Sequence, residues 1–299
     1  MAADDGRAGM KRQEAASGEA TPKPALIIAG PTASGKSALA LRLAERWGGT
    51  VINADAMQLY RELPILTAQP DAAARACAPH LLYGIASADE PADAARWRRK
   101  ALAAMEEAHA AGRLPILCGG TGLYLHVLQA GIAELPPIPP ALRADLAARL
   151  AAEGVAALYA ELTRLDPETA ARLRPRDAPR ILRALEVRLA TGQSLARWQR
   201  ENTRPLSGWR FAAILLEPPR PALRAAIAAR LAAQLEAGAL EEVRALLAAQ
   251  PPPRRWAASS ASTRRSRSPP GISGNTPSAR PPGSGTIVWR PKFIKSMRE

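Results

Sequence analysis

Short apolar runs alternate with stretches of helical periodicity along the first half of the chain. The runs at Ala25–Ala29, Thr50–Ala54 and Leu114–Cys118 are brief and mostly apolar, which predicts buried strands. Lys36–Trp47 and Ala92–Ala111 carry apolar side chains at helical spacing, which predicts helices between those strands. This alternation predicts an α/β fold, in which helices flank a parallel sheet and ligands gather at the carboxyl ends of the strands.

The pattern changes after the proline-rich segment Leu135–Pro140. From 141 to about 191 the chain is rich in Ala, Leu and Arg at helical spacing, which predicts an inserted, mainly helical module. A strand at Trp209–Leu216 and helices at Pro221–Ala237 and Leu240–Ala249 are predicted to return to the first sheet.

Positive charge is concentrated at the end of the chain. The formal net charge is +14, but the last fifty residues carry ten Lys or Arg and one Glu, and so contribute +9. These residues are rich in Pro, Ser and Arg without an apolar period, which predicts disorder.

We divide the chain into an extension at 1–24, an α/β core at 25–134 and 205–249, a helical insertion at 135–204 and a tail at 250–299.

The composition favours an intracellular protein. No apolar segment near the start is long enough for a signal peptide or a membrane span, so we expect a soluble, cytoplasmic protein with no membrane partner. Cys77 and Cys118 belong to no C-x-x-C pair, so we expect two reduced, buried thiols and neither a disulfide framework nor a zinc site.

The most specific chemical signal is the sequence GPTASGKS, which follows the first strand and opens the first helix. It comprises Gly30, Pro31, Thr32, Ala33, Ser34, Gly35, Lys36 and Ser37. Such a loop surrounds a di- or triphosphate with backbone N–H groups, while Lys36 adds charge and Ser37 offers a hydroxyl to Mg²⁺. It predicts a P-loop NTPase-like core, but kinases, NTPases and some transferases share this loop. The later strand runs into Thr121 and not into a magnesium-holding Asp, which argues against an ordinary NTPase.

Several separated motifs together resemble the tRNA dimethylallyltransferase family, also called tRNA isopentenyltransferases. They are GPTASGKS at 30–37, INADAMQLYRELPILTAQP at 52–70, LPILCGGTGLYL at 114–125, RDAPRILRALEVRLATG at 176–192 and LLEPPRPAL at 215–223. In family order they cover about 25–249, which is far more specific than the loop alone. The resemblance implies Mg²⁺-dependent transfer from dimethylallyl diphosphate to the amino group of adenine at position 37 of tRNA, next to the anticodon. The product would be N6-dimethylallyladenosine.

The resemblance also implies roles for individual residues. Asp55 would accept a proton from the adenine amine, Thr121 would donate a hydrogen bond to the departing oxygen, and Lys36 would stabilise its charge. A helix cap or a magnesium contact remains the alternative for Asp55. The implied tRNA contacts are Asp55, Ala56, Met57, Gln58, Thr121, Arg143, Pro179, Arg180, Ile181, Leu182 and Arg183. We expect a monomer.

The chain departs from the family at Gln69, where Lys is usual, and more seriously in the tail. Past 249 it lacks the apolar segment and the basic helix with which the family continues. A change of reading frame near codon 250 is one explanation, and a natural basic tail that binds RNA is the other. Translation of the gene in its other two frames distinguishes them.

Two rival functions remain open from sequence. A small-molecule or nucleoside kinase would use the same loop for ATP and Asp55 to activate a hydroxyl, but it leaves the motifs at 114–125 and 176–192 unexplained. A catalytically inactive nucleic-acid-binding protein would depend on the tail, and deletion of 251–299 would abolish its affinity.

Overall fold

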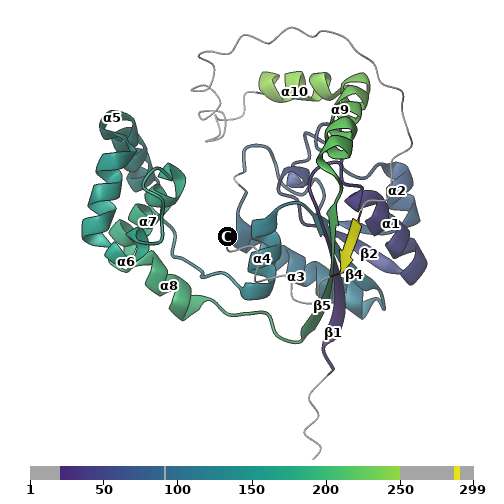
Figure 1. The fold of residues 1–299 in the computed structure, drawn as a ribbon, viewed down its shortest axis with the longest axis horizontal. Coiled ribbons are helices and arrows are strands. Elements are labelled where there is room, and N and C mark those ends of the chain that lie inside the picture. Colours follow the sequence, from purple (N-terminus) through teal and green to yellow (C-terminus); the bar gives the residue numbers. More distant parts are fainter. Residues whose placement is uncertain (1–20, 91, 250–285, 290–299) are drawn as a thin grey trace, which may run out of the picture.

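The computed structural model describes residues 21–90, 92–249 and 286–289. Its centre is a six-stranded sheet with strand order β3-β2-β4-β1-β5-β6 (Figure 1). The strands are β1 (Lys23–Ala29), β2 (Gly49–Asn53), β3 (His80–Leu81), β4 (Leu114–Gly119), β5 (Trp209–Glu217) and β6 (Thr286–Trp289). The first five are parallel, and β6 pairs antiparallel with β5. The predicted α/β fold is therefore confirmed.

Helices cover both faces of the sheet. On one face lie α1 (Lys36–Trp47) and the short α2 (Ala72–Cys77); on the other lie α3 (Ala94–Ala110) and α4 (Gly122–Ala130) (Figure 1). Strand β1 shows how the sequence builds both layers, because successive side chains of a strand point to opposite faces. Its residues at 26 and 28 pack with α1, whereas those at 25, 27 and 29 pack with α3 and α4.

The helical module lies between α4 and β5 in the chain and to one side of the sheet (Figure 1). It consists of α5 (Pro140–Leu165), α6 (Pro167–Ala170), α7 (Ala178–Thr191) and α8 (Leu195–Asn202). Helix α5 is interrupted at Gly154, whose φ of 81° is non-helical. The module has its own apolar core, which includes Leu146, Leu158, Leu162, Ile181 and Leu185.

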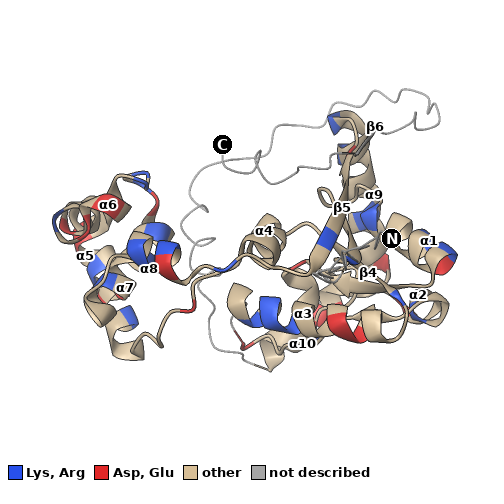
Figure 2. Ribbon diagram, turned by 90° about the horizontal axis from the view of Figure 1, so that it is seen from below, with Lys and Arg blue, Asp and Glu red and all other residues tan. Residues whose placement is uncertain are grey.

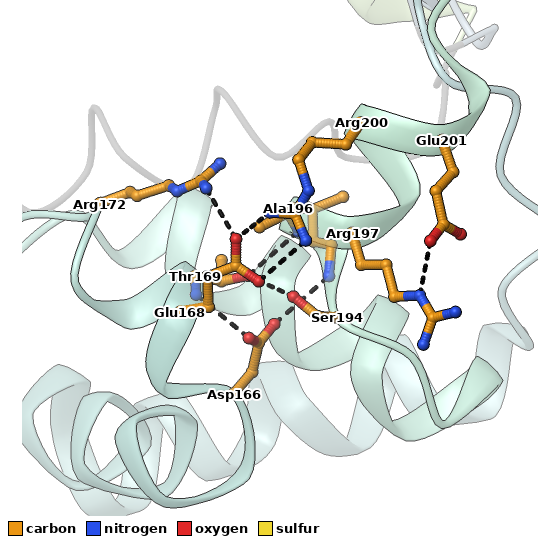
Figure 3. Close-up of polar contacts among 10 residues, drawn as sticks. Asp166, Glu168, Thr169, Arg172, Ser194, Ala196, Arg197, Arg200 and Glu201 are labelled. Carbon is orange, nitrogen blue, oxygen red and sulfur yellow. Dashed lines mark hydrogen bonds and ion pairs between the residues drawn. The ribbon is translucent and has the colours of Figure 1, made fainter.

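A polar network fixes α6 against α8 within this module (Figure 3). The Asp166 carboxylate accepts hydrogen bonds from the backbone N–H of Thr169 at 3.1 Å and of Leu195 at 3.3 Å. Glu168 contacts both Arg172, at 2.7 Å, and Arg200. These bonds cap the start of α6 and join it to the start of α8, so the last helices of the module have fixed positions.

Helices α9 (Arg220–Glu236) and α10 (Ala239–Ala248) follow β5 and lie over the carboxyl ends of the strands (Figure 1). Gly238, with φ of 101°, joins them in a left-handed conformation that favours glycine. In the described residues α9 has no buried side chain, and α10 has only Ala239. The two helices are therefore attached by something other than an apolar core.

The structure adds several elements that the sequence pattern did not predict. Helices α2, α4 and α8 and strand β3 were not assigned individually, and no regular element was expected after 250. The structure differs there at β6, whose sequence TIVW is suited to a strand and pairs with the otherwise open edge of β5. The other residues of the predicted extension (1–20) and of the tail lie outside the described residues.

The two cysteines lie in different environments. Cys118 is buried as expected, but Cys77 is exposed, because α2 is a short surface helix with no buried residue. Among the residues that the structure describes, none of the helices has the length and apolar character that crossing a membrane requires.

Candidate active site

Three of the predicted segments meet at the carboxyl edge of the sheet. The phosphate loop follows β1, Asp55 follows β2, and Thr121 follows β4, and these strands are adjacent and parallel. Gly120 marks their meeting point. A Cβ atom placed on it would lie 3.7 Å from Asp55 Oδ2 and 3.9 Å from Lys36 Nζ. The absence of a side chain at this position keeps the space between the carboxylate and the ammonium open.

The phosphate loop combines a buried ammonium with a buried hydroxyl. Gly35, with φ of 87°, begins α1 in a conformation that favours glycine. Lys36 is only 8% exposed, and its Nζ donates to the Pro31 carbonyl at 3.2 Å. The Ser34 hydroxyl is buried and has no hydrogen-bond partner among the described residues. A buried hydroxyl without a partner is costly, and an anionic oxygen in the loop would satisfy it.

Lys36 has an unusual electrostatic environment. Burial lowers its pKa, and the nearby Arg230 lowers it further, while Cys118 and Asp55 act in the opposite direction. A buried ammonium with a guanidinium in its surroundings favours a bound anion, because the anion relieves the desolvation of the ammonium and the repulsion between the two cations.

Asp55 is held by its neighbours so that one oxygen remains available. The buried Asn53 side chain accepts from the Asp55 backbone N–H at 2.8 Å and donates to the Asp55 carbonyl at 2.9 Å. Asp55 Oδ1 accepts from the Met57 backbone N–H at 3.0 Å, a bond that closes a turn two residues along the chain. The predicted alternative of a helix cap is wrong, because the 3₁₀ turn Met57–Leu59 begins at Ala56 without a side-chain cap. Asp55 Oδ2 makes no hydrogen bond within the described residues and faces the space beside Gly120. One carboxylate can therefore form the turn and still accept a proton.

Thr121 is positioned to donate. Its hydroxyl oxygen accepts from the Ala56 backbone N–H at 3.0 Å, and its own N–H donates to the Ala54 carbonyl at 3.3 Å. A threonine hydroxyl has one proton to donate, and this acceptor bond leaves that proton free. Thr121 also begins α4 without capping it, so its side chain is not used by the helix.

Arg230 of α9 is a site residue that the sequence analysis missed. Its guanidinium donates to the Thr67 carbonyl at 3.3 Å and lies near enough to Lys36 to affect the lysine pKa. The residue stands in an Ala- and Arg-rich helix without a recognisable motif. Its position on the inward face of the helix is the one signal that could have identified it, since Arg230 is partly buried whereas Arg220 and Arg224 are exposed.

A cavity of about 220 Å³ opens beside the phosphate loop. Ser37 stands at its margin, and its walls combine the apolar side chains of Leu41, Val51 and Tyr83 with the amides of Gln58 and Gln69. The cavity thus offers a small, partly apolar space next to the phosphate-binding groups.

The residues predicted to contact tRNA in the helical module fall into different environments. Glu186 is only 3% exposed and contacts Arg183 at 3.0 Å and Arg143 at 3.7 Å, so it holds these two half-exposed arginines side by side. Arg180 is far more exposed and pairs with Asp177 at 3.1 Å. Ile181 is fully buried in the module core, so its side chain is not available to a ligand.

A second cavity, of about 630 Å³, lies between the α/β core and the module. From the core it is lined by Asp93, Arg99 and Leu123, and from the module by Arg183 and Gln199. Leu123 is two residues after Thr121, so this cavity reaches from the first turn of α4 to Arg183 of α7. Basic segments occur on α3, α7 and α8 around this region (Figure 2).

The predicted magnesium ligand fits the donor set of the site. Within the described residues no cluster of three His, Cys, Asp or Glu side chains could hold a metal ion. Ser37 is an exposed residue at the start of α1, and its hydroxyl lies within hydrogen-bonding reach of the buried Cys118 thiol. Magnesium commonly binds through few protein oxygens together with substrate phosphates and water, and Ser37 beside a diphosphate offers that combination.

Comparisons with known proteins agree with the motifs. A family model described as IPP transferase matches residues 58–264, and one described as isopentenyl transferase matches 24–75. The chain is 56% identical over 224 residues to a tRNA dimethylallyltransferase of Granulibacter bethesdensis. The aligned segment covers 75% of this chain and 70% of that protein. A relative of the same name in Acidiphilium cryptum is also 56% identical, over 77% of this chain and 69% of its own.

Solved structures give the same result. The tRNA isopentenylpyrophosphate transferase of Bacillus halodurans is 32% identical with a TM-score of 0.52, over 79% of this chain and 73% of that one. A eukaryotic dimethylallyltransferase solved acting on tRNA is 29% identical with a TM-score of 0.62, over 75% of this chain and 56% of its own. The resemblance inferred from the motifs is thereby confirmed, and the chain belongs to the IPP transferase family, that of the tRNA dimethylallyltransferases.

Proposed function

We propose that this protein transfers a dimethylallyl group from dimethylallyl diphosphate to the exocyclic amino group of the adenine at position 37 of tRNA. The observation that carries the proposal is the arrangement around Gly120, where Asp55 Oδ2 and Lys36 Nζ face one open space. The names of the relatives favour this reaction over the kinase alternative. Mg²⁺ as cofactor, a monomeric state and a cytoplasmic location belong to the same proposal.

The phosphate loop acts on the leaving group. As the bond between the allylic carbon and the diphosphate oxygen breaks, negative charge grows on that oxygen. The loop amides, Lys36 and Arg230 then stabilise the transition state more than the ground state. Thr121 donates its hydroxyl proton in a hydrogen bond to the departing oxygen. Magnesium at Ser37 would neutralise part of the diphosphate charge.

Asp55 acts on the nucleophile. The amino group of adenine is weakly nucleophilic because its lone pair is delocalised into the ring. Asp55 Oδ2 accepts the proton that the nitrogen loses as its bond to carbon forms, while diphosphate leaves with the electrons of the broken bond. The carboxylate is suited to this role because its other oxygen is fixed by the Met57 N–H.

The adenine must leave its stack to reach Asp55, and this requires anchors on the RNA backbone. The cavity between the core and the module supplies space for the nucleotides on either side. Arg143 and Arg183, paired on Glu186, supply two adjacent guanidinium groups that suit phosphates.

Replacement of both Arg143 and Arg183 by Ala should weaken tRNA binding and flatten its salt dependence. The slope of log K against log salt should fall by about 0.7 for each phosphate that the protein no longer neutralises. The KM for tRNA should therefore rise, while kcat at saturating tRNA changes little. A double Arg164→Ala and Arg172→Ala variant removes the same charge from exposed positions elsewhere in the module and serves as control. Equal weakening of tRNA binding in the two variants would refute a specific role for Arg143 and Arg183.

Labelled substrates separate the proposed reaction from the kinase. The purified protein is incubated with unmodified tRNA and either dimethylallyl diphosphate labelled in its carbon chain or ATP labelled in its γ-phosphate. We expect the carbon label to enter tRNA in a magnesium-dependent reaction and no γ-phosphate to be transferred to a nucleoside or small-molecule acceptor. Transfer of the phosphate label without the carbon label would overturn the proposal.

A further inference from the structure

Two side chains of the last described helices hold a loop of the first half of the chain. The loop comprises residues 64–69 and follows the 3₁₀ turn at Met57–Leu59. The Glu242 carboxylate of α10 accepts hydrogen bonds from the backbone N–H groups of Ile65 at 2.7 Å and Leu66 at 2.9 Å. A carboxylate with one N–H on each oxygen makes a charge-assisted, two-point contact that fixes the orientation of the backbone.

Gln234 of α9 binds the carbonyl groups of the same two loop residues. Its amide nitrogen donates to the carbonyls of Ile65 at 2.8 Å and Leu66 at 2.7 Å. Both N–H and both C=O groups of these two loop residues are thus bonded to side chains about 170 positions later. Backbone groups that fold away from water need partners, and here side chains of two helices provide one for each of these groups. The Ile65 carbonyl also accepts from the Ala68 N–H at 3.0 Å.

The next residues of the loop lie at the proposed active site. The Thr67 carbonyl accepts from both Gln58 at 3.0 Å and Arg230 at 3.3 Å, and the Ala68 carbonyl accepts from Gln58 at 2.8 Å. Ala68 has φ of 51°, a left-handed conformation that costs free energy for a residue other than glycine. Ala68 and Gln69 form part of the wall of the 220 Å³ cavity. Any movement of Ile65 and Leu66 would therefore reach Arg230 and this wall.

Polar contacts, and not apolar packing, attach α9 and α10 at this point. The residues of α9 that turn inward include Arg230 and Gln234, whereas Ile227, Leu231 and Leu235 are exposed. Removal of the Glu242 bonds would therefore free the Ile65 and Leu66 N–H groups without opening an apolar core, while Gln234 and Gln58 still bind carbonyls of the loop.

We propose that Glu242 and Gln234 are positioning residues for the allylic diphosphate site. They hold residues 65–66 so that the Thr67 carbonyl, which accepts from Arg230, stays in place and the cavity beside Ser37 keeps its shape. The inference rests on the proposed function for the identity of the substrate, but the coupling between α10 and the phosphate loop does not depend on it.

The test uses Glu242→Ala and Glu242→Gln, with Glu241→Ala as the matched control. Glu241 is the preceding residue, is 65% exposed and pairs with Arg244 on the surface of the same helix. Because Glu242→Ala removes charge-assisted bonds to two amides, this variant should bind inorganic diphosphate and dimethylallyl diphosphate about tenfold more weakly. Glutamine retains one acceptor oxygen and should give an intermediate value. The KM of Glu242→Ala for tRNA should stay near the wild-type value. Diphosphate binding by Glu241→Ala should also stay near the wild-type value.

Hydrogen exchange of the Ile65 and Leu66 amides provides a readout that is independent of catalysis. We expect faster exchange in Glu242→Ala than in the wild type and no change in Glu241→Ala. Unchanged exchange would overturn the proposal, and so would faster exchange with unaltered diphosphate binding. If Glu242→Ala does not fold, the same comparison is made with Glu242→Gln. Failure of the proposed function would instead be seen in the wild type, as absence of prenyl transfer with the loop bonds intact.

Discussion

Replacement of Asp55 by Asn should lower kcat by about 10²–10⁴-fold, the usual contribution of a general base. The amide cannot accept a proton from the adenine amine, but its oxygen can still accept the Met57 N–H bond and preserve the turn. The affinity for dimethylallyl diphosphate and for tRNA should change little, since the missing interaction matters only as the proton moves.

Single-turnover transfer with saturating tRNA measures this effect without interference from product release. Binding of both substrates is measured on the same preparation by calorimetry. A near-normal transfer rate in Asp55→Asn would leave Asp55 only with its bond to the Met57 N–H and would remove the proposed base. Loss of binding in parallel with the rate would point to misfolding of the turn, which the hydrogen bonds of Asn53 should prevent.

Replacement of Lys36 by Ala should lower kcat/KM for the allylic diphosphate by about 10²–10³-fold, as does the removal of one group that stabilises a developing oxyanion. The ammonium is buried beside the space that the diphosphate would occupy, so water replaces it poorly. Most of the decrease should appear in kcat, because charge on the bridging oxygen increases only when the carbon–oxygen bond breaks.

Lys23→Ala is the control for removal of one positive charge. Lys23 begins β1 at the opposite edge of the sheet and pairs with Glu106 on the surface, so its removal should leave kcat/KM unchanged. Steady-state kinetics of the two variants at varied donor concentration provide the comparison. Equal effects would mean that the general positive field of the protein, and not Lys36, attracts the donor.

The sequence predicted the parts of the fold that depend on local pattern. The strands β1, β2, β4 and β5 and the helices α1 and α3 occur within two residues of their predicted limits, because a buried strand or an amphipathic helix has a period visible in a short window. Helix α4 was missed because its sequence, GLYLHVLQA, is apolar on most sides and follows a run of glycines. Strand β3 has only two residues and depends on its pairing with β2.

The site also has residues that the sequence predicted and residues that it did not. The phosphate loop, Asp55 and Thr121 were predictable because each follows a strand, and parallel strands end at one edge of the sheet. The role of Glu186 under two arginines and the contacts of Glu242 with Ile65 and Leu66 were not predictable. Arg143 reaches Glu186 from another helix, and Glu242 contacts Ile65 across 177 positions, and a single sequence contains no signal for such pairs.

Mass spectrometry of tRNA nucleosides tests the central claim most directly. Unmodified tRNA with adenine next to the anticodon is incubated with the full-length protein, dimethylallyl diphosphate and Mg²⁺, then digested and analysed. We predict that one adenosine per molecule gains the mass of a dimethylallyl group, that it is the one at position 37, and that the Asp55→Asn protein leaves it unmodified over the same time. Two results would contradict the account: wild-type protein that binds both substrates but leaves the adenosine unmodified, or equal modification by the wild type and the variant. Either result would refute the proposal that Lys36 acts on the leaving diphosphate and Asp55 on the adenine amine.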